Sequence, residues 1–251
     1  MISLQNKNVL ITGGSRGIGK TCVEKFLEAG ANVAFTFQSA KNNAEEIKHS
    51  YHGEALLKYY RINLSNTDEI IKGINFIVND FGGIDILINN AGIWKEAAID
   101  KMTLEQWNEM MNINLTSTYL ITKLVVPLMK EKNFGRIINI ASTAGQRGEA
   151  FHAHYAASKG GMISLTKSLA SELGQFNITV NCVAPGWVIT DMTKDSLEDK
   201  EIYNKVIGDI PLKKVAQPSE IAGPVLFLAS NLASHITGEI LNVNGGSVLC
   251  G

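Results

Sequence analysis

Short apolar runs typical of buried strands alternate with stretches of helical length along the whole chain. The runs are NVLIT (8–12), NVAFTF (32–37), ALLKYYRI (55–62), IDILIN (84–89), GRIINIA (135–141), ITVNCVA (178–184) and EILNV (239–243). The stretches between them include 17–29, 66–81, 104–132 and 153–174. This order requires crossover connections and a parallel sheet covered on both faces. The sequence therefore predicts an α/β fold, a single doubly wound, Rossmann-type domain over 1–251 with about seven parallel strands.

Composition and charge exclude several other classes of protein. An apolar fraction of 45% is ample for a large core, and 23 basic residues balance 24 acidic ones with no long run of either sign. We therefore expect neither disorder nor a nucleic-acid partner. The apolar stretch at the start is too short for a signal peptide, and no later run is long enough to span a bilayer, so we expect no membrane partner.

The cysteines indicate the compartment. Cys22, Cys182 and Cys250 are widely spaced, odd in number and form no C-x-x-C pair. This pattern favours reduced thiols in a cytoplasmic protein over a disulfide framework or a zinc site. His152 and His154 have no evident third ligand, so we expect no metal.

One region breaks the alternation of strands and helices. Between Pro185 and Pro218 the sequence is polar, weakly periodic and interrupted. A long segment of this kind in a compact domain is usually a lid or a binding loop, and we predict that 187–212 is a substrate loop or lid. The alternative is a mobile surface excursion.

The stretch GSRGIGKT (14–21) follows the first predicted strand and opens the first predicted helix. It satisfies the P-loop pattern G-x-x-x-x-G-K-[ST], but a P-loop enzyme also needs an acidic residue that ends an apolar strand and holds magnesium. The best candidate, Asp85, begins its strand instead. A glycine-rich turn at a helix N-terminus suits a dinucleotide pyrophosphate equally well. The context therefore favours dinucleotide binding by TGGSRGIG (12–19).

Further motifs follow in order. NNAG (89–92) ends the fourth predicted strand, Ser142 ends the fifth, and Tyr155 and Lys159 form Y-x-x-x-K near the start of a predicted helix. Open parallel sheets bind ligands beyond the carboxyl ends of their strands. With the Asn of NINL and with PGWVITDM after the sixth strand, the chain resembles the short-chain dehydrogenase/reductase family over essentially its whole length.

The resemblance implies an NAD(P)-dependent enzyme that interconverts a ketone and a secondary alcohol by hydride transfer. It assigns proton transfer to Tyr155, tuning of that tyrosine and binding of the nicotinamide ribose to Lys159, orientation of the carbonyl to Ser142, and a place in the proton relay to Asn114. The cofactor site that it implies consists of Tyr155 and Lys159 together with Gly13, Ser15, Arg16, Gly17, Ile18, Gly19, Gln38, Ser39, Asn63, Leu64, Asn90, Ala91, Gly92, Pro185, Gly186, Val188 and Thr190.

The spacing of the catalytic residues also has a direct physical meaning. On a helix, Tyr155 and Lys159 lie side by side on one face. A phenol is a poor acid–base catalyst at neutral pH, and a nearby ammonium lowers its pKa because it favours the phenolate. Ser142 is placed to donate a hydrogen bond to the substrate oxygen as negative charge develops there.

The end of the second strand indicates which dinucleotide is used. An NAD site needs a carboxylate there for the ribose 2′-hydroxyl, and Phe37 stands in its place. Arg16 attracts a 2′-phosphate, and Gln38 and Ser39 add hydrogen bonds, so the sequence predicts NADP(H) in preference to NAD(H). Asn63 stands where the family usually has an adenine-binding Asp.

The subfamily resemblance is to 3-oxoacyl-acyl-carrier-protein reductases, which implies a 3-oxoacyl substrate on acyl-carrier protein or CoA, in fatty acid metabolism. We expect Trp94, His152, Trp187 and Met192 in the substrate pocket; core packing is the alternative for the tryptophans. The resemblance implies that an acidic carrier protein docks on basic residues near the mouth of the active site. The arginines that it implies for docking, before Gly135 and before Ile178, are replaced by Asn133 and Phe176. The lysines that could replace them in docking are Lys130, Lys132, Lys213 and Lys214.

Two other functions remain open. One is a sugar, polyol or small-ketone dehydrogenase of the same family, and the other is a nucleotide-binding regulator without catalysis. The complete set of Asn114, Ser142, Tyr155 and Lys159 argues against the regulator. The resemblance also implies a homotetramer.

Overall fold

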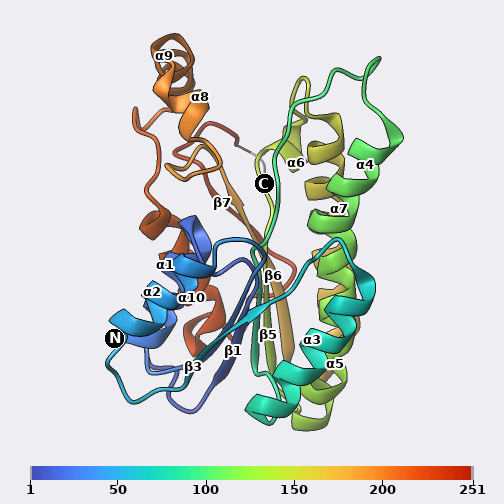
Figure 1. Cartoon of the computed structure of the whole chain (residues 1–251), viewed down its shortest axis with the longest axis vertical. Helices are drawn as coiled ribbons and strands as arrows, with labels where there is room; N and C mark the ends of the chain where they lie inside the picture. The colour runs from blue at the N-terminus through green and yellow to red at the C-terminus, as the bar shows by residue number, and fades with distance from the viewer. Residues whose placement is uncertain (1, 250–251) are drawn as a thin grey trace.

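The computed structural model describes residues 2–249 and is built around a sheet of seven parallel strands (Figure 1). The strands are β1 (Asn8–Ile11), β2 (Asn32–Phe37), β3 (Leu57–Arg61), β4 (Ile86–Asn89), β5 (Gly135–Ile140), β6 (Ile178–Pro185) and β7 (Ile240–Val243). They lie in the order β3-β2-β1-β4-β5-β6-β7. The predicted doubly wound α/β fold is confirmed, and every predicted strand overlaps an observed one.

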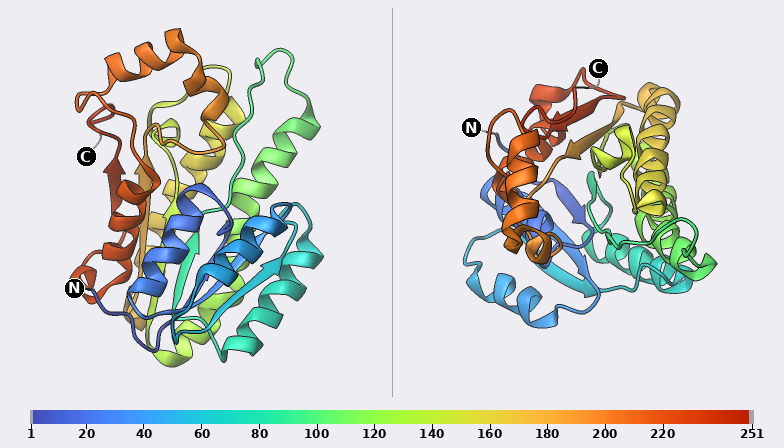
Figure 2. Two further views of the ribbon diagram at one scale, coloured as in Figure 1. Left: turned by 60° about the vertical axis from the view of Figure 1, so that its left-hand side comes forward. Right: turned by 90° about the horizontal axis from the view of Figure 1, so that it is seen from above.

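Helices cover both faces of the sheet. Figure 1 shows α1 (Gly17–Glu28), α2 (Lys41–Ser50) and α10 (Pro218–Ala229) on one side, and α3 (Thr67–Phe81), α5 (Ser117–Lys132) and α7 (Ala153–Leu173) on the other. The other helical elements are α4 (Leu104–Met111), the π-helical turn η1 (Asn112–Thr116), α6 (Ala144–Arg147), the 3₁₀ turn η2 (Gly174–Phe176), α8 (Lys194–Glu198), α9 (Lys200–Asp209) and the 3₁₀ turn η3 (Asn231–Ala233). The view from above shows the same three layers (Figure 2).

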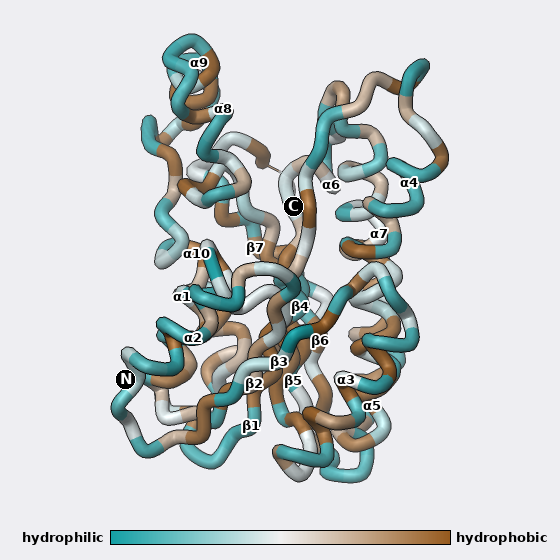
Figure 3. Tube along the Cα trace, in the orientation of Figure 1, coloured by the Kyte–Doolittle hydropathy of each residue, from teal (hydrophilic) through white to brown (hydrophobic). Residues whose placement is uncertain are grey.

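The two faces of the central strands pack into two separate apolar cores. Val9 and Ile11 of β1 belong to the core that contains Phe26 of α1. Leu10, between them, belongs to the core that contains Ile74 of α3. Successive side chains of a strand point to opposite faces, so a strand buried on both sides has a continuous apolar sequence. Figure 3 shows the apolar strands at the centre of the molecule in brown.

Local sequence signals set the ends of the helices. The Asn66 side chain accepts hydrogen bonds from two backbone N–H groups at the start of α3, and Gly82 ends that helix in the left-handed conformation. Thr103 and Gln106 form a capping box at the start of α4. The predicted helix 104–132 is therefore bounded as expected, but it contains the π-helical turn η1 between α4 and α5.

The strand order reverses at β1, and this reversal positions the site. From β1 the chain adds β2 and β3 on one side, then β4 to β7 on the other. The crevice between the carboxyl ends of β1 and β4 is where open α/β sheets bind ligands. The glycine-rich turn follows β1 and NNAG ends β4, so both motifs meet at this crevice.

The segment 187–212 contains more regular structure than its polar sequence suggests. It holds α8 and α9, and Asp199 caps α9 through two backbone N–H groups. Val206, Ile210 and Val215 form a small apolar cluster distinct from the two main cores. This unit lies above the carboxyl ends of the strands (Figure 1).

The structure also bears on membrane-spanning helices and on the cysteines. Among residues 2–249, no helix is long and apolar enough to cross a bilayer. Cys22 and Cys182 are buried free thiols. Cys250 lies outside the described residues.

Candidate active site

The glycine-rich turn lies between β1 and α1. Gly13 has a φ of +66°, which glycine adopts without strain, and a Cβ atom at Gly19 would lie 2.1 Å from the carbonyl oxygen of Gly13. Only glycine therefore lets α1 pack this close to the turn. Helix α1 has no side-chain cap and no acidic residue in its first turn. Its first N–H groups are free to bind an anion, which fits a dinucleotide pyrophosphate.

Thr12 and Asn90 tie this turn to the end of β4. The Thr12 hydroxyl accepts hydrogen bonds from the backbone N–H groups of Asn90 and Ala91, both at 3.0 Å. The Asn90 amide donates to the carbonyl oxygens of Thr12 at 2.9 Å and Gly13 at 3.1 Å. Two motifs far apart in the sequence thus form one continuous floor across the crevice.

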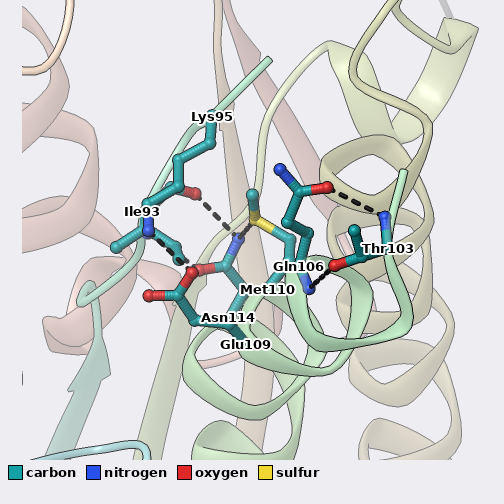
Figure 4. Close-up of polar contacts among 7 residues, drawn as sticks. All are labelled: Ile93, Lys95, Thr103, Gln106, Glu109, Met110 and Asn114. Atoms are coloured by element: carbon teal, nitrogen blue, oxygen red, sulfur yellow. Dashed lines mark hydrogen bonds and ion pairs between the residues drawn. The ribbon is translucent and has the colours of Figure 1, made fainter. Parts of the chain in front are cut away.

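Asn114 is fully buried in η1, and its side chain links separate segments (Figure 4). Its Oδ1 accepts from the backbone N–H of Ile93 at 2.8 Å, and its Nδ2 donates to the carbonyl oxygen of Ile93 at 3.0 Å. The same Nδ2 lies 3.1 Å from Oγ of Ser158, the residue before Lys159. The side chain therefore positions the loop after β4 against α7. Its place in a proton relay stays a prediction.

Lys159 extends from α7 to the end of β5. Its Nζ donates to the carbonyl oxygen of Ile140 at 2.6 Å, and its side chain is buried. A Cβ atom at Gly92 would lie 3.5 Å from this Nζ and 3.2 Å from Oδ1 of Asn114, so the glycine leaves room for both groups. Burial lowers the pKa of Lys159 to about 8, against a smaller opposite effect of Cys182.

Tyr155 precedes Lys159 by one helical turn, and the Lys159 Nζ lies 5.9 Å from the centre of the tyrosine ring. Burial raises the pKa of Tyr155 to about 12; the hydrogen bond with Ser142 acts in the opposite direction, and the Glu149 carboxylate raises this pKa further. The expected lowering of the tyrosine pKa is not found, because desolvation by burial is the largest effect on it and raises it. The phenol therefore keeps its proton at neutral pH.

One cleft brings most of the predicted residues together over the carboxyl ends of the strands. Its lining includes the predicted catalytic residues Ser142, Tyr155 and Lys159, and the predicted cofactor residues Gly13, Ser15, Arg16, Gly17, Ile18, Gly19, Gln38, Ser39, Leu64, Asn90, Ala91, Gly92, Pro185, Gly186, Val188 and Thr190. The predicted substrate residues Trp94, Trp187 and Met192 line it as well. Asn63, Asn114 and His152 do not.

The end of the cleft near β2 carries the residues predicted to recognise a 2′-phosphate. Phe37 ends β2 and lines the cleft, so no carboxylate occupies that position. The Arg16 guanidinium is largely exposed and lies 3.9 Å from the carboxylate of Asp191. Asn63 accepts a hydrogen bond from the Gln38 amide at 3.2 Å, so it positions Gln38 at this end of the cleft.

The opposite end of the cleft has aromatic walls. Trp94 stacks on His152 with ring centres 4.5 Å apart and an angle of 3° between the planes. It meets Trp187 edge-on, with ring centres 5.9 Å apart. His152 therefore supports Trp94 from outside the cleft lining, whereas Met192 lines the cleft and is half-exposed.

Comparisons with known proteins identify the family. A family model described as enoyl-(acyl carrier protein) reductase matches residues 13–247. The 3-oxoacyl-[acyl-carrier-protein] reductase FabG of Aquifex aeolicus (strain VF5) is 44% identical, over 98% of this chain and 98% of the relative. The chain belongs to the short-chain dehydrogenase/reductase family. It is an oxidoreductase that uses a nicotinamide cofactor.

Two further comparisons extend this result. The 3-oxoacyl-[acyl-carrier-protein] reductase FabG of Vibrio cholerae serotype O1 is 43% identical, over 98% of this chain and 98% of the relative. The crystal structure of gox2181 has a TM-score of 0.92 and 33% identity, and the match covers 98% of this chain and 96% of that one. The dehydrogenase fold and sequence thus extend over nearly the whole chain.

Three charged residues that line the cleft, Arg147, Glu149 and Asp191, were not predicted from the sequence. Arg147 and Glu149 both line the cleft, and both lie within the 13-residue interval between Ser142 and Tyr155. The signal that was available is their position, because residues between two catalytic groups on adjacent elements must pass close to the reacting centre.

The apolar residues of 187–212 divide between two locations. Trp187, Val188 and Met192 line the cleft. Leu197 packs against the small cluster that contains Val206, as Trp187 also does, and Ile189 is exposed. The part of the segment next to β6 therefore forms one wall of the cleft.

Proposed function

We propose that this enzyme is an NADP(H)-dependent reductase of 3-oxoacyl thioesters, which converts the 3-oxo group to a secondary alcohol. The observation that carries the proposal is the identity of 44% and 43%, over 98% of both chains, to two relatives named 3-oxoacyl-[acyl-carrier-protein] reductase. The convergence of Ser142, Tyr155 and Lys159 in one cleft supports the same chemistry.

The catalytic roles follow from the surroundings of each group. The bound nicotinamide supplies the hydride. Ser142 orients the carbonyl through a hydrogen bond that strengthens as negative charge develops on the oxygen. Tyr155 gives that oxygen a proton, and its raised pKa supports this role because the phenol holds a proton to donate at neutral pH. Lys159 binds the nicotinamide ribose and favours the phenolate left after the transfer.

The cofactor preference rests on charge. Arg16 is exposed and lines the same cleft as Phe37, where β2 ends without a carboxylate. A 2′-phosphate therefore gains a cationic partner there and meets no repulsion from the β2 end. The nearby Asp191 weakens this attraction, since it pairs with Arg16 at 3.9 Å. We infer a moderate preference for NADPH.

A substrate panel tests both parts of the proposal. An acetoacetyl thioester, simple ketones and keto sugars are assayed with NADPH and with NADH by loss of nicotinamide absorbance. We expect the thioester with NADPH to give the highest kcat/KM among these pairs. A keto sugar turned over faster than the thioester would contradict the acyl assignment, and no turnover with any substrate would favour a regulator.

Substitution of Arg16 tests the cofactor argument. Arg16→Ala should reduce the difference in kcat/KM between NADPH and NADH, chiefly by raising the KM for NADPH, because the exposed guanidinium contributes to binding of the 2′-phosphate. Lys20→Ala, at an exposed cation of α1 outside the cleft lining, is the control and should leave this difference as it is. A wild-type enzyme that prefers NADH would contradict the argument.

Domain organisation, compartment and assembly are also part of the proposal. We infer that 1–251 acts as a single catalytic domain, with 187–212 as its substrate loop. The buried free thiols Cys22 and Cys182 support a reducing compartment, which we take to be the cytoplasm. A homotetramer is inferred from the family.

A further inference from the structure

Glu149 is a carboxylate in the cleft that the proposed reaction does not use. It lies between the catalytic Ser142 and Tyr155 in the sequence and lines the same cleft. Its charge raises the pKa of the Tyr155 phenol, with which it shares the cleft. Its side chain is 24% exposed. A substrate that fills the cleft therefore removes much of the remaining water from this carboxylate.

The hydrogen bonds of Glu149 are incomplete. Its Oε1 accepts from Nε1 of Trp94 at 3.3 Å and lies 3.6 Å from Nδ1 of His152. That nitrogen is also 3.0 Å from the carbonyl oxygen of Ala150. No other residue among 2–249 bonds to the carboxylate, and Oε2 has no partner. An ionised carboxyl group has about four acceptor sites, so most of its capacity remains for a ligand.

The surroundings of Glu149 restrict what that ligand is. Trp94 and Trp187 form aromatic walls. None of the arginines and lysines in the described cleft lining forms an ion pair with Glu149. A plain aliphatic acyl chain placed there would dehydrate the carboxylate and give it no donor, which is costly. A short chain with a hydroxyl group gives the carboxylate an O–H donor and places its C–H groups against the tryptophans.

We propose that Glu149 accepts a hydrogen bond from a hydroxyl group on the carbon next to the reacting carbonyl, and that the enzyme therefore also reduces short α-hydroxy ketones. This inference rests on the proposed function, because it uses the same ketone chemistry. The carbonyl carbon gains a hydride from the reduced nucleotide and the carbonyl oxygen gains the Tyr155 proton, so the products are a vicinal diol and the oxidised nucleotide.

A matched pair of substrates tests the inference. 1-Hydroxy-2-butanone and 3-pentanone differ only in a hydroxyl group in place of a methyl group. We expect wild type to prefer the hydroxy ketone, and Glu149→Leu to reduce the ratio of the two kcat/KM values roughly 10- to 100-fold, as for a hydrogen bond to a charged group. The change in this ratio isolates the direct contact. An effect of Glu149 on Tyr155 applies equally to both substrates, and the difference in carbonyl reactivity between the substrates applies equally to both enzymes.

A conservative variant and a binding measurement complete the test. Glu149→Gln keeps an acceptor oxygen of the same size and should retain more of the preference than Glu149→Leu. Butane-1,2-diol should change the intrinsic tryptophan fluorescence at lower concentration than pentan-3-ol, because it binds beside Trp94. NADPH binding to each variant confirms that it is folded.

The outcomes separate this inference from the proposed function. Equal ratios in wild type and Glu149→Leu would overturn the inference, as would reduction of an acetoacetyl thioester without any turnover of the hydroxy ketone. Turnover of the hydroxy ketone with a ratio that falls in Glu149→Leu supports it. Failure of wild type to reduce the thioester while it reduces the hydroxy ketone would overturn only the thioester assignment.

Discussion

The two titratable groups at the centre of the site are shifted in opposite directions by the same cause. Burial raises the pKa of Tyr155 to about 12 and lowers that of Lys159 to about 8. Both shifts favour the neutral form, because a low-dielectric environment disfavours charge of either sign. The site therefore holds a protonated phenol one helical turn from an ammonium that loses its proton more readily than an exposed lysine does.

Replacement of the phenol hydroxyl tests this assignment. Tyr155→Phe should leave NADPH binding nearly intact and remove turnover, because only the proton-donating oxygen is lost. Ser142→Ala should cost less, on the order of 10² to 10³ in kcat, as for one oxyanion donor. Single-turnover kinetics and nucleotide titration measure the two effects separately. A kcat for Tyr155→Phe equal to that of wild type would exclude the tyrosine as the proton donor.

For single residues, the sequence predicted which residues belong to the site better than it predicted the surroundings of those residues. Ser142, Tyr155 and Lys159 were predicted from the family resemblance that their order and spacing support, and the cleft contains all three. The direction of the tyrosine pKa was wrong, because it depends on how much protein surrounds the ring, which spacing does not reveal. The stacking of His152 on Trp94 was not predictable for the same reason: it depends on two loops that meet only in the fold.

Among the elements, the helical stretch 104–132 shows how a functional position alters regular structure. Sequence periodicity predicts a continuous helix, and the caps at its ends agree. The π-helical turn η1 in its middle inserts one extra residue per turn, a feature that occurs often at functional sites. It holds Asn114 where its amide reaches both Ile93 and Ser158. A periodicity argument misses it because the buried positions around this turn include the polar residues Asn114, Ser117 and Thr118, so the apolar pattern is interrupted there.

The helical part of 187–212, the segment that we propose as the substrate loop, has few buried side chains. Helix α8 has no buried residue, and α9 has only Val206. Its links to the cofactor end include the exposed ion pair between Asp191 and Arg16, which contributes little to stability. A segment with few buried contacts opens locally at low free-energy cost, as a closing loop requires.

Hydrogen exchange should therefore report ligand-dependent order in this segment. With saturating NADP⁺ and an inhibitor, protection should rise more in 187–212 than in β4 or β5, because those buried strands are ordered without ligand. Mass-spectrometric exchange with and without nucleotide measures the difference, and α3, which lies outside the cleft, is the internal control. Unchanged exchange in 187–212 would leave it a surface excursion and move specificity to Trp94 and Glu149.

For the whole molecule, the strand order explains why so dispersed a set of motifs meets in one cleft. The reversal at β1 places the ends of β1 and β4 side by side, and β5 and β6 follow in order. The strict alternation of strand and helix was sufficient to predict this layered fold, because crossovers have one preferred hand. It carries no information about surfaces between chains, and the homotetramer was inferred from resemblance alone.

The outer surface of the helices on the α3, α5 and α7 side of the sheet provides a physical test of the proposed homotetramer. Leu104 of α4 and Tyr119 of α5 are 68% and 47% exposed, although Met110 of α4 and Val125 of α5 are buried. In a closed symmetric assembly one copy of each side chain is buried in every subunit, and burial of each large apolar group stabilises the assembly by roughly 1.5 to 3 kcal/mol. We therefore expect wild type to sediment with the mass of four chains.

A charge placed on this surface should weaken the assembly. Leu104→Glu combined with Tyr119→Glu should sediment as dimers or monomers, because each interface then buries several unpaired carboxylates. Phe76→Glu is the control: Phe76 is 62% exposed on α3, so it carries the same change from apolar to acidic at a comparably exposed helical site. If the double variant keeps the mass of wild type, α4 and α5 do not form the contact. If wild type itself sediments as a monomer at micromolar concentration, the tetramer is wrong, and the exposed side chains of this layer face solvent.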